Sequence, residues 1–586
     1  MNSAQFSGNA GIVRFNRDFY SQTDEFTFIG DGEFGGKASG LAFIKEKILS
    51  HYRGLDHPFS PFTVTIPRLV VITTPFFDRF MDQNNLYEIA LSDMSDERIA
   101  HHFLKAELPP DLSGDLRALI ARVHEPLAIR SSSLLEDSVD SPFAGIYETK
   151  MIPNNQPDAD TRFRKLAEAI KFVYASTFFN SAKSYIKATP HDIKAEKMAV
   201  IIQEVLGQRH YDRFYPHFAG VARSYNFYPT GQAKPEEGVV NLALGLGKAI
   251  VDGGMSWAYS PAYPNISPPY GSVGELMKQT QIEFWAVNMG KPPAFDPAKE
   301  TEYLVKAGLQ EAEYDNTLTY LASTYDPGSD RVNIGVGSAG PRIITFAPIL
   351  QVSMLPLNPL IQSILKLCEE TFSARVETEF AVNIDPVQKT ARFGFLQVRP
   401  MALSAVEVDL EESDFVPGSL LTSSESAMGN GCIEGIRDIL YLVPETFNLK
   451  DSRAMAGEIA AVNRKLLDTH TPYLLIGFGR WGSSDPWLGI PVDWGHISGA
   501  RVIVEAQLPN ASFGIDLSQG SHFFHNLSNL GILYFSIPRT SVFPIDWEWL
   551  KKQELLDEGK FSRHVRLTSP LTVKVDGRNR QGVILK

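Results

Sequence analysis

Residues 125–149 read EPLAIRSSSLLEDSVDSPFAGIYET, and this stretch decides how the chain is interpreted. Its apolar start predicts a buried strand that runs directly into Arg130 and three serines. A guanidinium and hydroxyl groups at the end of a strand suit a chain of phosphates, because arginine offers oxyanions a planar fork of donors. The alternative is a structural arginine that pairs with Glu136 or Asp137. For Arg130 taken alone, both interpretations stay open.

Two further glycine-containing stretches are candidates for approach to phosphates: GDGEFGGKASGL at 30–41 and NLALGLGKAIVDGG at 241–254. In the first, Lys37 follows two glycines and supplies a point charge, although the Walker A spacing is absent. A tight turn before a helix is the competing interpretation of the first stretch. A glycine-rich turn after a strand is the competing interpretation of the second.

Outward from these stretches, strand and helix signals alternate. Apolar runs predict strands at 197–206 and 392–401. Residues 68–81 are predicted to form a strand followed by a helix. Apolar positions three and four residues apart predict one amphipathic helix over 162–186. The charged, turn-rich residues 294–330 indicate a surface insertion. Alternation of this kind favours an α/β or α+β fold over an all-helical one.

The domain organisation that we predict has three regions and a linker. The first region covers residues 1–225 and the second covers 226–403. An acidic and then serine-rich stretch without periodicity, 404–425, is predicted to be the linker to a third region, 426–586. A chain of 586 residues is long enough for about three to four domains.

Composition excludes several classes of protein. Hydrophobic residues make up 44% and charged residues 21%, as in globular proteins, and the formal net charge is −13. That charge argues against nucleic acid or a membrane surface as a partner. The two cysteines and the absence of a secretory start fit a cytoplasmic protein. Three prolines interrupt the uncharged stretch 343–365, which argues against a membrane-spanning helix.

Taken in order, five blocks resemble the nucleotide-binding domain of pyruvate phosphate dikinases and phosphoenolpyruvate synthases, a relative of the ATP-grasp folds. The blocks are GGKASGL (35–41), RSSSLLEDSVDSPFAGIYET (130–149), VIIQEVL (200–206), GLGKAIVDGG (245–254) and ETEFAVN…FLQVRPM (377–401). Five ordered blocks are far more specific than any one of them. The resemblance implies an ATP-grasp-like domain that binds ATP and Mg²⁺.

For the phosphate end of such a site, the resemblance implies roles for individual residues. Lys37 and Arg130 would contact the ATP phosphates, and Arg399 would contact the transferred group. Glu379 and Gln397 would hold Mg²⁺. Magnesium takes hard oxygen ligands and needs few of them from protein, which suits a carboxylate paired with an amide oxygen.

For the remainder of the nucleotide, the resemblance implies that Gln203, Glu204 and Val205 form a hinge whose backbone binds adenine. Gly145 and Lys248 would complete the nucleotide-binding residues. Lys248 stands where the family usually has an acidic residue. Arg223, in GVARSYNF (220–227), similarly stands where a small or apolar residue is usual.

The third region has a stretch, SQGSHFFHNLSNLGILYF at 518–535, that resembles the swivelling phosphohistidine domain of the same enzymes. The resemblance implies that His522 carries a phosphoryl group. The alternatives are a packed histidine, or His525 as the better-placed ring. A Gly/Trp-rich segment at 474–498 has no counterpart in that resemblance, and is either a ligand-binding loop or a packed connection.

The function that we expect is ATP-dependent phosphoryl transfer, passing through His522 to an acceptor. A direct kinase whose acceptor is held by the segment 474–498 is the first alternative, and a nucleotide-binding regulator without chemistry is the second. We expect no phosphoenolpyruvate/pyruvate barrel, which has ~250 residues, after residue 586. The acceptor is therefore expected to be another protein, a small molecule bound by the third region, or nothing. The sequence does not give the oligomeric state.

Overall fold

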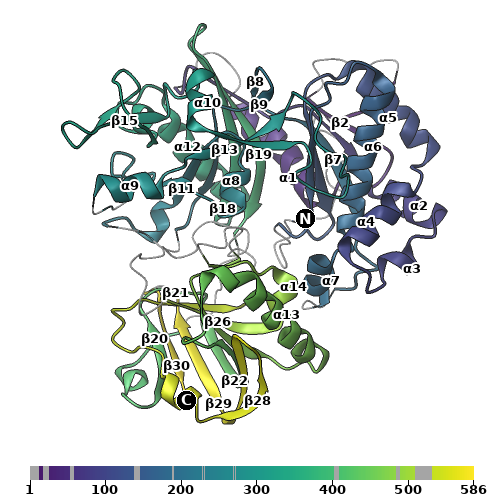
Figure 1. Ribbon diagram of the computed structural model, residues 1–586. Helices are drawn as coiled ribbons and strands as arrows, with labels where there is room; N and C mark the ends of the chain where they lie inside the picture. Colours follow the sequence, from purple (N-terminus) through teal and green to yellow (C-terminus); the bar gives the residue numbers. More distant parts are fainter. Residues whose placement is uncertain are drawn as a thin grey trace.

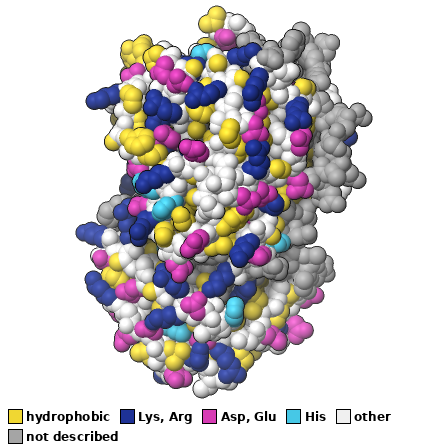
Figure 2. Space-filling view, turned by 90° about the vertical axis from the view of Figure 1, so that its right-hand side faces the viewer, with side chains coloured by type: hydrophobic (Ala, Val, Ile, Leu, Met, Phe, Trp, Pro, Cys, Tyr) yellow, Lys and Arg dark blue, Asp and Glu magenta, His cyan; other side chains and the backbone are white. Residues whose placement is uncertain are grey.

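A computed structural model shows a chain in three parts, with two lobes side by side and a third part below them (Figure 1). The structure describes residues 12–17, 25–52, 58–136, 145–187, 191–226, 229, 231–267, 270, 272–401, 408–482, 489–507, 531–577 and 579–586. Positive and negative side chains are interspersed over the face shown in Figure 2. Among the helices in these ranges, none is long and apolar enough to cross a membrane.

The first lobe is a six-stranded mixed sheet covered by helices. Its strands in spatial order are β1 (Val13–Arg14), β2 (Phe26–Ile29), β4 (Leu69–Ile72), β7 (Met198–Glu204), β5 (Leu127–Ser133) and β6 (Thr149–Ile152). Its helices are α2 (Thr74–Gln83), α3 (Tyr87–Ala90), α4 (Asp96–Lys105), α5 (Pro110–Arg122), α6 (Ala159–Ser176) and α7 (Asn180–Lys187). Buried aromatic rings, among them Phe77, Phe80 and Tyr174, join the helices to one another.

The single helix predicted over 162–186 is wrong, because the structure divides it into α6 and α7. The chain between them, 177–179, places Phe178 in the core at 1% exposure. The carboxylate of Asp96 accepts a hydrogen bond from the Asn180 backbone N–H at 2.8 Å, at the start of α7. This tertiary contact turns α7 away, so its surface is free to meet the third part of the chain.

The second lobe is built on another six-stranded sheet. Its strands in spatial order are β12 (Trp257–Tyr259), β11 (Val239–Leu244), β10 (Phe218–Arg223), β18 (Val376–Asp385), β19 (Thr390–Pro400) and β3 (Phe62–Thr65). Helix α12 (Leu357–Phe372) packs on β18 and β10. Two small sheets extend the lobe: β8 (Gln208–His210), β9 (Arg213–Tyr215), β13 (Glu283–Asn288) and β14 (Leu304–Gly308) form one, and β15 (Ala322–Asp326), β16 (Arg331–Ile334) and β17 (Arg342–Ile344) the other. The remaining helices are α8 (Lys248–Val251), α9 (Val273–Gln279), α10 (Leu309–Tyr314) and α11 (Ala347–Leu350).

The two lobes are interleaved in sequence and in space. Strand β3 comes from early in the chain but pairs with β19 of the second lobe. Helix α1 (Gly35–Phe43) packs against both β5 and β19. Gly35 begins this helix with φ at +74°, and a Cβ there would collide with the carbonyl oxygen of Ser132. Glycine is required at that point so that α1 can lie directly against the end of β5.

The third part is a nine-stranded mixed sheet with helices at its edge. Its strands are β20 (Leu420–Ser424), β30 (Gln581–Leu585), β29 (Ser562–Asp576), β22 (Gly431–Leu442), β23 (Tyr473–Phe478), β26 (Ala500–Ala506), β27 (Leu533–Ile537) and β21 (Ala427–Met428), with β28 (Glu554–Glu558) paired to β29. Within the linker that the sequence pattern predicts over 404–425, residues 420–424 form the buried strand β20 of this sheet. Beside the sheet lie α13 (Ser452–Asp468), α14 (Trp494–Ile497) and α16 (Trp547–Leu550), and the short sheet of β24 (Arg480–Trp481) with β25 (Gly489–Ile490). The mixed α/β class predicted from the sequence is confirmed.

Candidate functional site

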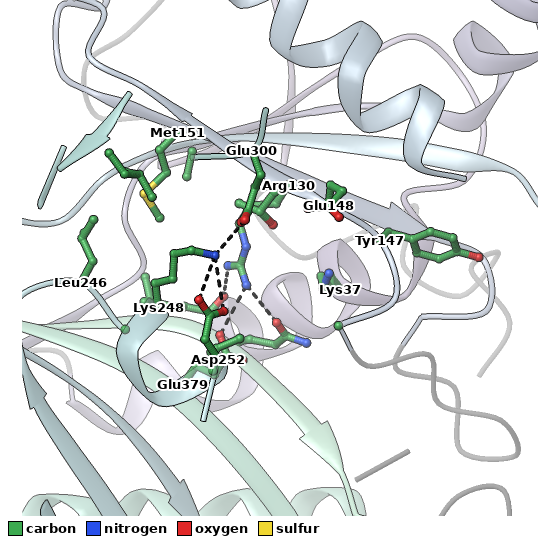
Figure 3. A pocket seen from close by; sticks show the side chains of 18 of the residues that line it. Lys37, Arg130, Tyr147, Glu148, Met151, Leu246, Lys248, Asp252, Glu300 and Glu379 are labelled. Carbon is green, nitrogen blue, oxygen red and sulfur yellow. Dashed lines mark hydrogen bonds and ion pairs between the residues drawn. The ribbon is translucent and has the colours of Figure 1, made fainter. Parts of the chain in front are cut away.

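A cavity of about 530 Å³ lies where the three parts of the chain meet, and Figure 3 shows it from close by. Every residue predicted from the sequence to bind nucleotide or metal lines it: Lys37, Arg130, Gly145, Gln203, Glu204, Val205, Lys248, Glu379 and Gln397, together with Arg399. The sequence placed these residues in separate blocks, and the fold brings them to one place. His522 lies outside the described residues, so its position relative to the cavity stays a prediction.

Lys37 of α1 lines the cavity, and its ammonium group is held by two side chains. Its Nζ donates to Glu136 Oε1 at 2.5 Å and to Ser131 Oγ at 2.9 Å. Glu136 is fully buried, and its other carboxylate oxygen accepts from the Ser133 backbone N–H at 2.9 Å. The sequence offered Glu136 as a partner for Arg130, whereas the structure pairs it with Lys37. A buried carboxylate of this kind fixes the lysine ammonium in position.

Arg130 connects the two lobes at the centre of the cavity. From β5 its guanidinium donates to Gln203 Oε1 at 3.2 Å, to the Leu396 carbonyl at 2.6 Å and to Gln397 Oε1 at 2.9 Å. The acceptor at Leu396 exists because of a β-bulge: Glu379 faces Gln397 and Phe380 faces Phe395, which leaves Leu396 without a partner residue on β18. The bulge therefore presents a carbonyl to the arginine of the opposite lobe.

Glu379 and Gln397 face each other across β18 and β19. One guanidinium nitrogen of Arg130 lies 2.9 Å from Gln397 Oε1 and 3.6 Å from Glu379 Oε2, so both side-chain oxygens border the same cation. A carboxylate and an amide oxygen beside the same guanidinium fit Mg²⁺, which commonly takes one or two protein oxygens along with phosphates and water. The register of the two strands thus places the two residues predicted to hold Mg²⁺ opposite each other, and their role stays a prediction.

Arg399 is positioned by a carboxylate that the sequence analysis missed. Its guanidinium donates to Glu377 Oε1, with the Nε–Oε1 distance 2.9 Å, and Arg223 Nε donates to the other oxygen of Glu377 at 2.5 Å. All three side chains are buried. This contact explains the unusual Arg223, which shares the Glu377 carboxylate with Arg399. The signal was present in the sequence, since a charged residue on a predicted central strand needs a partner.

The residues predicted to form the adenine hinge, Gln203 to Val205, lie at the end of β7, beside the apolar side of the cavity. Met151, Leu246 and Leu304 line this side together with Val205. The backbone N–H groups of Glu204 and Val205 donate to the carbonyls of Arg68 and Pro126, both at 2.9 Å. The apolar walls suit a flat heterocycle, while these two N–H groups already have acceptors within the protein.

A comparison with protein families matches residues 32–414 to the family described as pyruvate phosphate dikinase, AMP/ATP-binding domain. The chain belongs to this family. The resemblance inferred from the five blocks is therefore confirmed. A curated relative named "Uncharacterized phosphotransferase YvkC", from Bacillus subtilis (strain 168), is 26% identical over 194 residues. Those residues are 33% of this chain and 20% of the relative, so the chain spans about a fifth of that protein's length.

Lys248 of this AMP/ATP-binding domain points across the cavity rather than into solvent (Figure 3). Its Nζ lies 3.2 Å from Asp252 and 2.8 Å from Glu300. Burial, together with the negative charge of Glu300, raises the pKa of Glu148, which also lines the cavity, to about 8. Lys248 and Glu148 thus give this side of the cavity a titratable polar cluster.

Glu300 reaches the cavity because part of the insertion crosses to the first lobe. Lys150 of β6 donates to the carbonyls of Pro297 and Lys299, at 2.7 and 3.0 Å, and pairs with Glu302 at 2.8 Å. Lys150 and Glu302 are almost fully buried. The prediction of a surface insertion over 294–330 is wrong for residues 297–302, because the buried ion pair of Lys150 with Glu302 holds them against the first lobe.

The third part closes one side of the cavity. Gly482 and the residues from Pro491 to Trp494 line it, next to Ser181 of α7. These residues belong to the Gly/Trp-rich segment 474–498, for which the sequence left a ligand-binding loop and a packed connection as alternatives. Within this segment, α14 packs on α7, and Gly482 and the residues from Pro491 to Trp494 face the cavity, so that ligand binding by the segment stays a prediction.

Proposed function

We propose that this chain is an ATP-dependent phosphotransferase that uses Mg²⁺ and transfers phosphate to an acceptor near the third part of the chain. One observation carries the proposal: Lys37, Arg130 and Arg399 converge on a cavity that also holds the oxygen pair of Glu379 and Gln397. Three cations beside a pair of metal-binding oxygens are more than nucleotide binding alone requires. A regulator that binds ATP without chemistry has no use for this arrangement.

The residues of the chain have separate tasks in the proposed reaction. Lys37 and Arg130 bind and orient the phosphates, and their positions are fixed by Glu136 and by the Leu396 carbonyl. Arg399, held by Glu377, stabilises negative charge that develops on the transferred group. When bound, Mg²⁺ supplies charge neutralisation of the phosphates at Glu379 and Gln397. The third part of the chain, through Gly482 and the residues from Pro491 to Trp494, would shield the cavity from water during transfer.

The route of the phosphoryl group is the finer part of the proposal. In one route it passes to His522 and then to the acceptor, as in the dikinases that this chain resembles. His522 lies outside the described residues, so this route rests on the resemblance of the stretch 518–535 to the phosphohistidine domain.

In the second route, transfer is direct and the acceptor binds against the third part. The observation that favours it is the presence of residues from Pro491 to Trp494 on the cavity wall. The two routes predict different covalent species, because only the first forms a phosphohistidine.

Incubation with Mg²⁺ and ATP labelled at the β or γ phosphate tests the function and its route. AMP as product supports dikinase-type chemistry, and ADP supports a simple kinase. Acid-labile, base-stable label that vanishes in His522→Ala but persists in His525→Ala supports the phosphohistidine. Binding without any turnover in the presence of diverse acceptors would favour a nucleotide-binding regulator instead.

A further inference from the structure

The wall that the third part contributes to the cavity combines apolar side chains with one carboxylate. Val492 and Trp494 are apolar and only 5% and 4% exposed, and Pro491 precedes them. Between them, Asp493 carries a carboxylate whose side chain is 59% exposed. Apolar surface next to an accessible carboxylate is the composition expected for recognition of an uncharged organic group.

This wall is built and firmly docked. The Trp494 ring meets Tyr185 of α7 edge to face, with ring centroids 5.9 Å apart and planes at 84°. A Cβ on Gly495 would lie 3.6 Å from Ser184 Oγ, so the first turn of α14 lies directly against α7. Asn463 Nδ2 donates to the Gly495 carbonyl at 3.1 Å from the other side. Contacts on both sides fix the orientation of this turn.

The docked wall lies towards the phosphate end of the cavity. Ser181, one helical turn before Tyr185 on α7, lines the same cavity as Lys37 and Arg399. Burial raises the pKa of Tyr185, and the positive charge of Arg399 acts in the opposite direction on the same phenol. Arg399 and α7, on which Trp494 packs, therefore border the same cavity.

We infer that Pro491–Trp494 form an acceptor subsite for a neutral hydroxyl compound with an apolar face, and that Asp493 receives the hydroxyl proton. This inference rests on the proposed phosphotransferase function and specifies its direct route. An anionic acceptor would be repelled by Asp493 and by the nucleotide phosphates, whereas an apolar face gains contact with Val492 and Pro491.

The transfer step balances with groups at this site. The acceptor oxygen forms a bond to the γ-phosphorus of ATP, and the bond from that phosphorus to the β,γ-bridging oxygen breaks. The bonding electrons leave with ADP, and the acceptor proton moves to the Asp493 carboxylate. One oxygen of that carboxylate already accepts the His496 backbone N–H at 3.2 Å, and a carboxylate has further lone pairs for the proton.

The test uses the full chain with Mg²⁺, ATP and three probe alcohols: benzyl alcohol, glycerol and glycolate. Formation of phosphate esters is followed by phosphorus NMR, and ATP affinity by calorimetry. We expect benzyl phosphate to form fastest and glycolate to be the poorest acceptor. Asp493→Asn keeps a good helix N-cap but removes the base, so ester formation falls by about 10²–10⁴-fold while ATP affinity stays within about twofold.

Two further variants separate the acceptor role from a structural one. Asp158→Asn changes the N-cap of α6, where Asp158 accepts the Thr161 N–H at 2.7 Å, and leaves ester formation unchanged. Val492→Ala raises the KM for benzyl alcohol by about fourfold per methyl group removed and leaves that for glycerol unchanged. If Asp493→Asn does not fold, the Val492→Ala result decides.

The subsite is overturned if glycolate is the preferred acceptor. It is also overturned if Asp493→Asn leaves the rate of ester formation unchanged and Val492→Ala leaves the KM for benzyl alcohol unchanged. Turnover of ATP without ester from any probe in the wild type would also overturn it, while leaving the proposed function intact. If the wild-type protein neither binds nor turns over ATP, the proposed function itself is refuted.

Discussion

Replacing Glu379 by Gln separates a metal-binding role from a structural one. The substitution keeps the size of the side chain and removes its charge. In the folded protein this breaks one ion pair, with Arg130 at 3.6 Å, between side chains that are 12% and 15% exposed. The Coulomb attraction at that distance is about 4–5 kcal/mol at an effective dielectric constant of ~20, and desolvation of both groups offsets most of it. Because Arg130 keeps its bonds to Gln203, Leu396 and Gln397, the net loss of stability is about 1 kcal/mol.

Turnover should respond far more strongly than stability. A metal ion contributes several kcal/mol of charge stabilisation in a transition state, and each ~1.4 kcal/mol is a factor of ten in rate. Weakened metal binding in Glu379→Gln is therefore expected to lower Mg²⁺-dependent ATP turnover by at least about a hundredfold, with a thermal midpoint within a few degrees of the wild type. The assays are nucleotide analysis over a Mg²⁺ titration and a melting curve.

Glu283→Gln is the matched control. Glu283 pairs with Lys306 at 3.5 Å, nearly the same distance, but both side chains are more than half exposed and neither lines the cavity. Its turnover should equal that of the wild type. If Glu379→Gln melts the protein, or if its turnover and Mg²⁺ dependence match those of Glu283→Gln, the assignment of the metal pair is refuted.

Lys37→Ala removes a cationic phosphate contact, so calorimetry should show ATP affinity lower by roughly ten- to a hundredfold. The single substitution also leaves Glu136 buried without its ammonium partner. The double variant Lys37→Ala/Glu136→Gln should therefore regain stability but not ATP affinity. ATP affinity equal to that of the wild type in the single and the double variant would contradict the assignment of Lys37 to the ATP site. The Glu148 carboxyl, with its pKa of about 8 against an ordinary value of 4.5, is neutral at pH 7 and anionic above pH 8, so ATP affinity should fall severalfold from pH 7 to 9. The folded state holds this proton more tightly, so the free energy of unfolding falls as pH rises from about 4.5 to 8, and Glu148→Gln should reduce both pH dependences. Lys150→Met leaves Glu302 unpaired in the interior and should lower the free energy of unfolding in urea by about 3–5 kcal/mol, with partial recovery on adding Glu302→Gln.

The sequence by itself determined the family and the mixed α/β class. It could do so because the signals are local: an apolar run ending in Arg130, glycines before Lys37, and the alternation around Glu379 each need only a few neighbouring residues. Strand formation and a glycine at a close approach are decided by the residues themselves, and the strands at β4, β5, β7 and β19 lie where the pattern predicted them.

Only the tertiary structure decided how those pieces are joined. The split between α6 and α7 depends on Asp96, more than eighty residues from Asn180, and no helical periodicity contains that contact. The bulge that gives Arg130 the carbonyl of Leu396 depends on how two strands pair, and a period of two does not specify one extra residue.

The same holds for the residues that surround the candidate site. Glu377 joins Arg223 to Arg399 across different strands, and Lys150 holds the stretch that ends at Glu302. The third part places Trp494 against α7. A buried charge requires a partner, but the sequence does not say which distant side chain supplies it, because that choice follows from the packing of the whole chain.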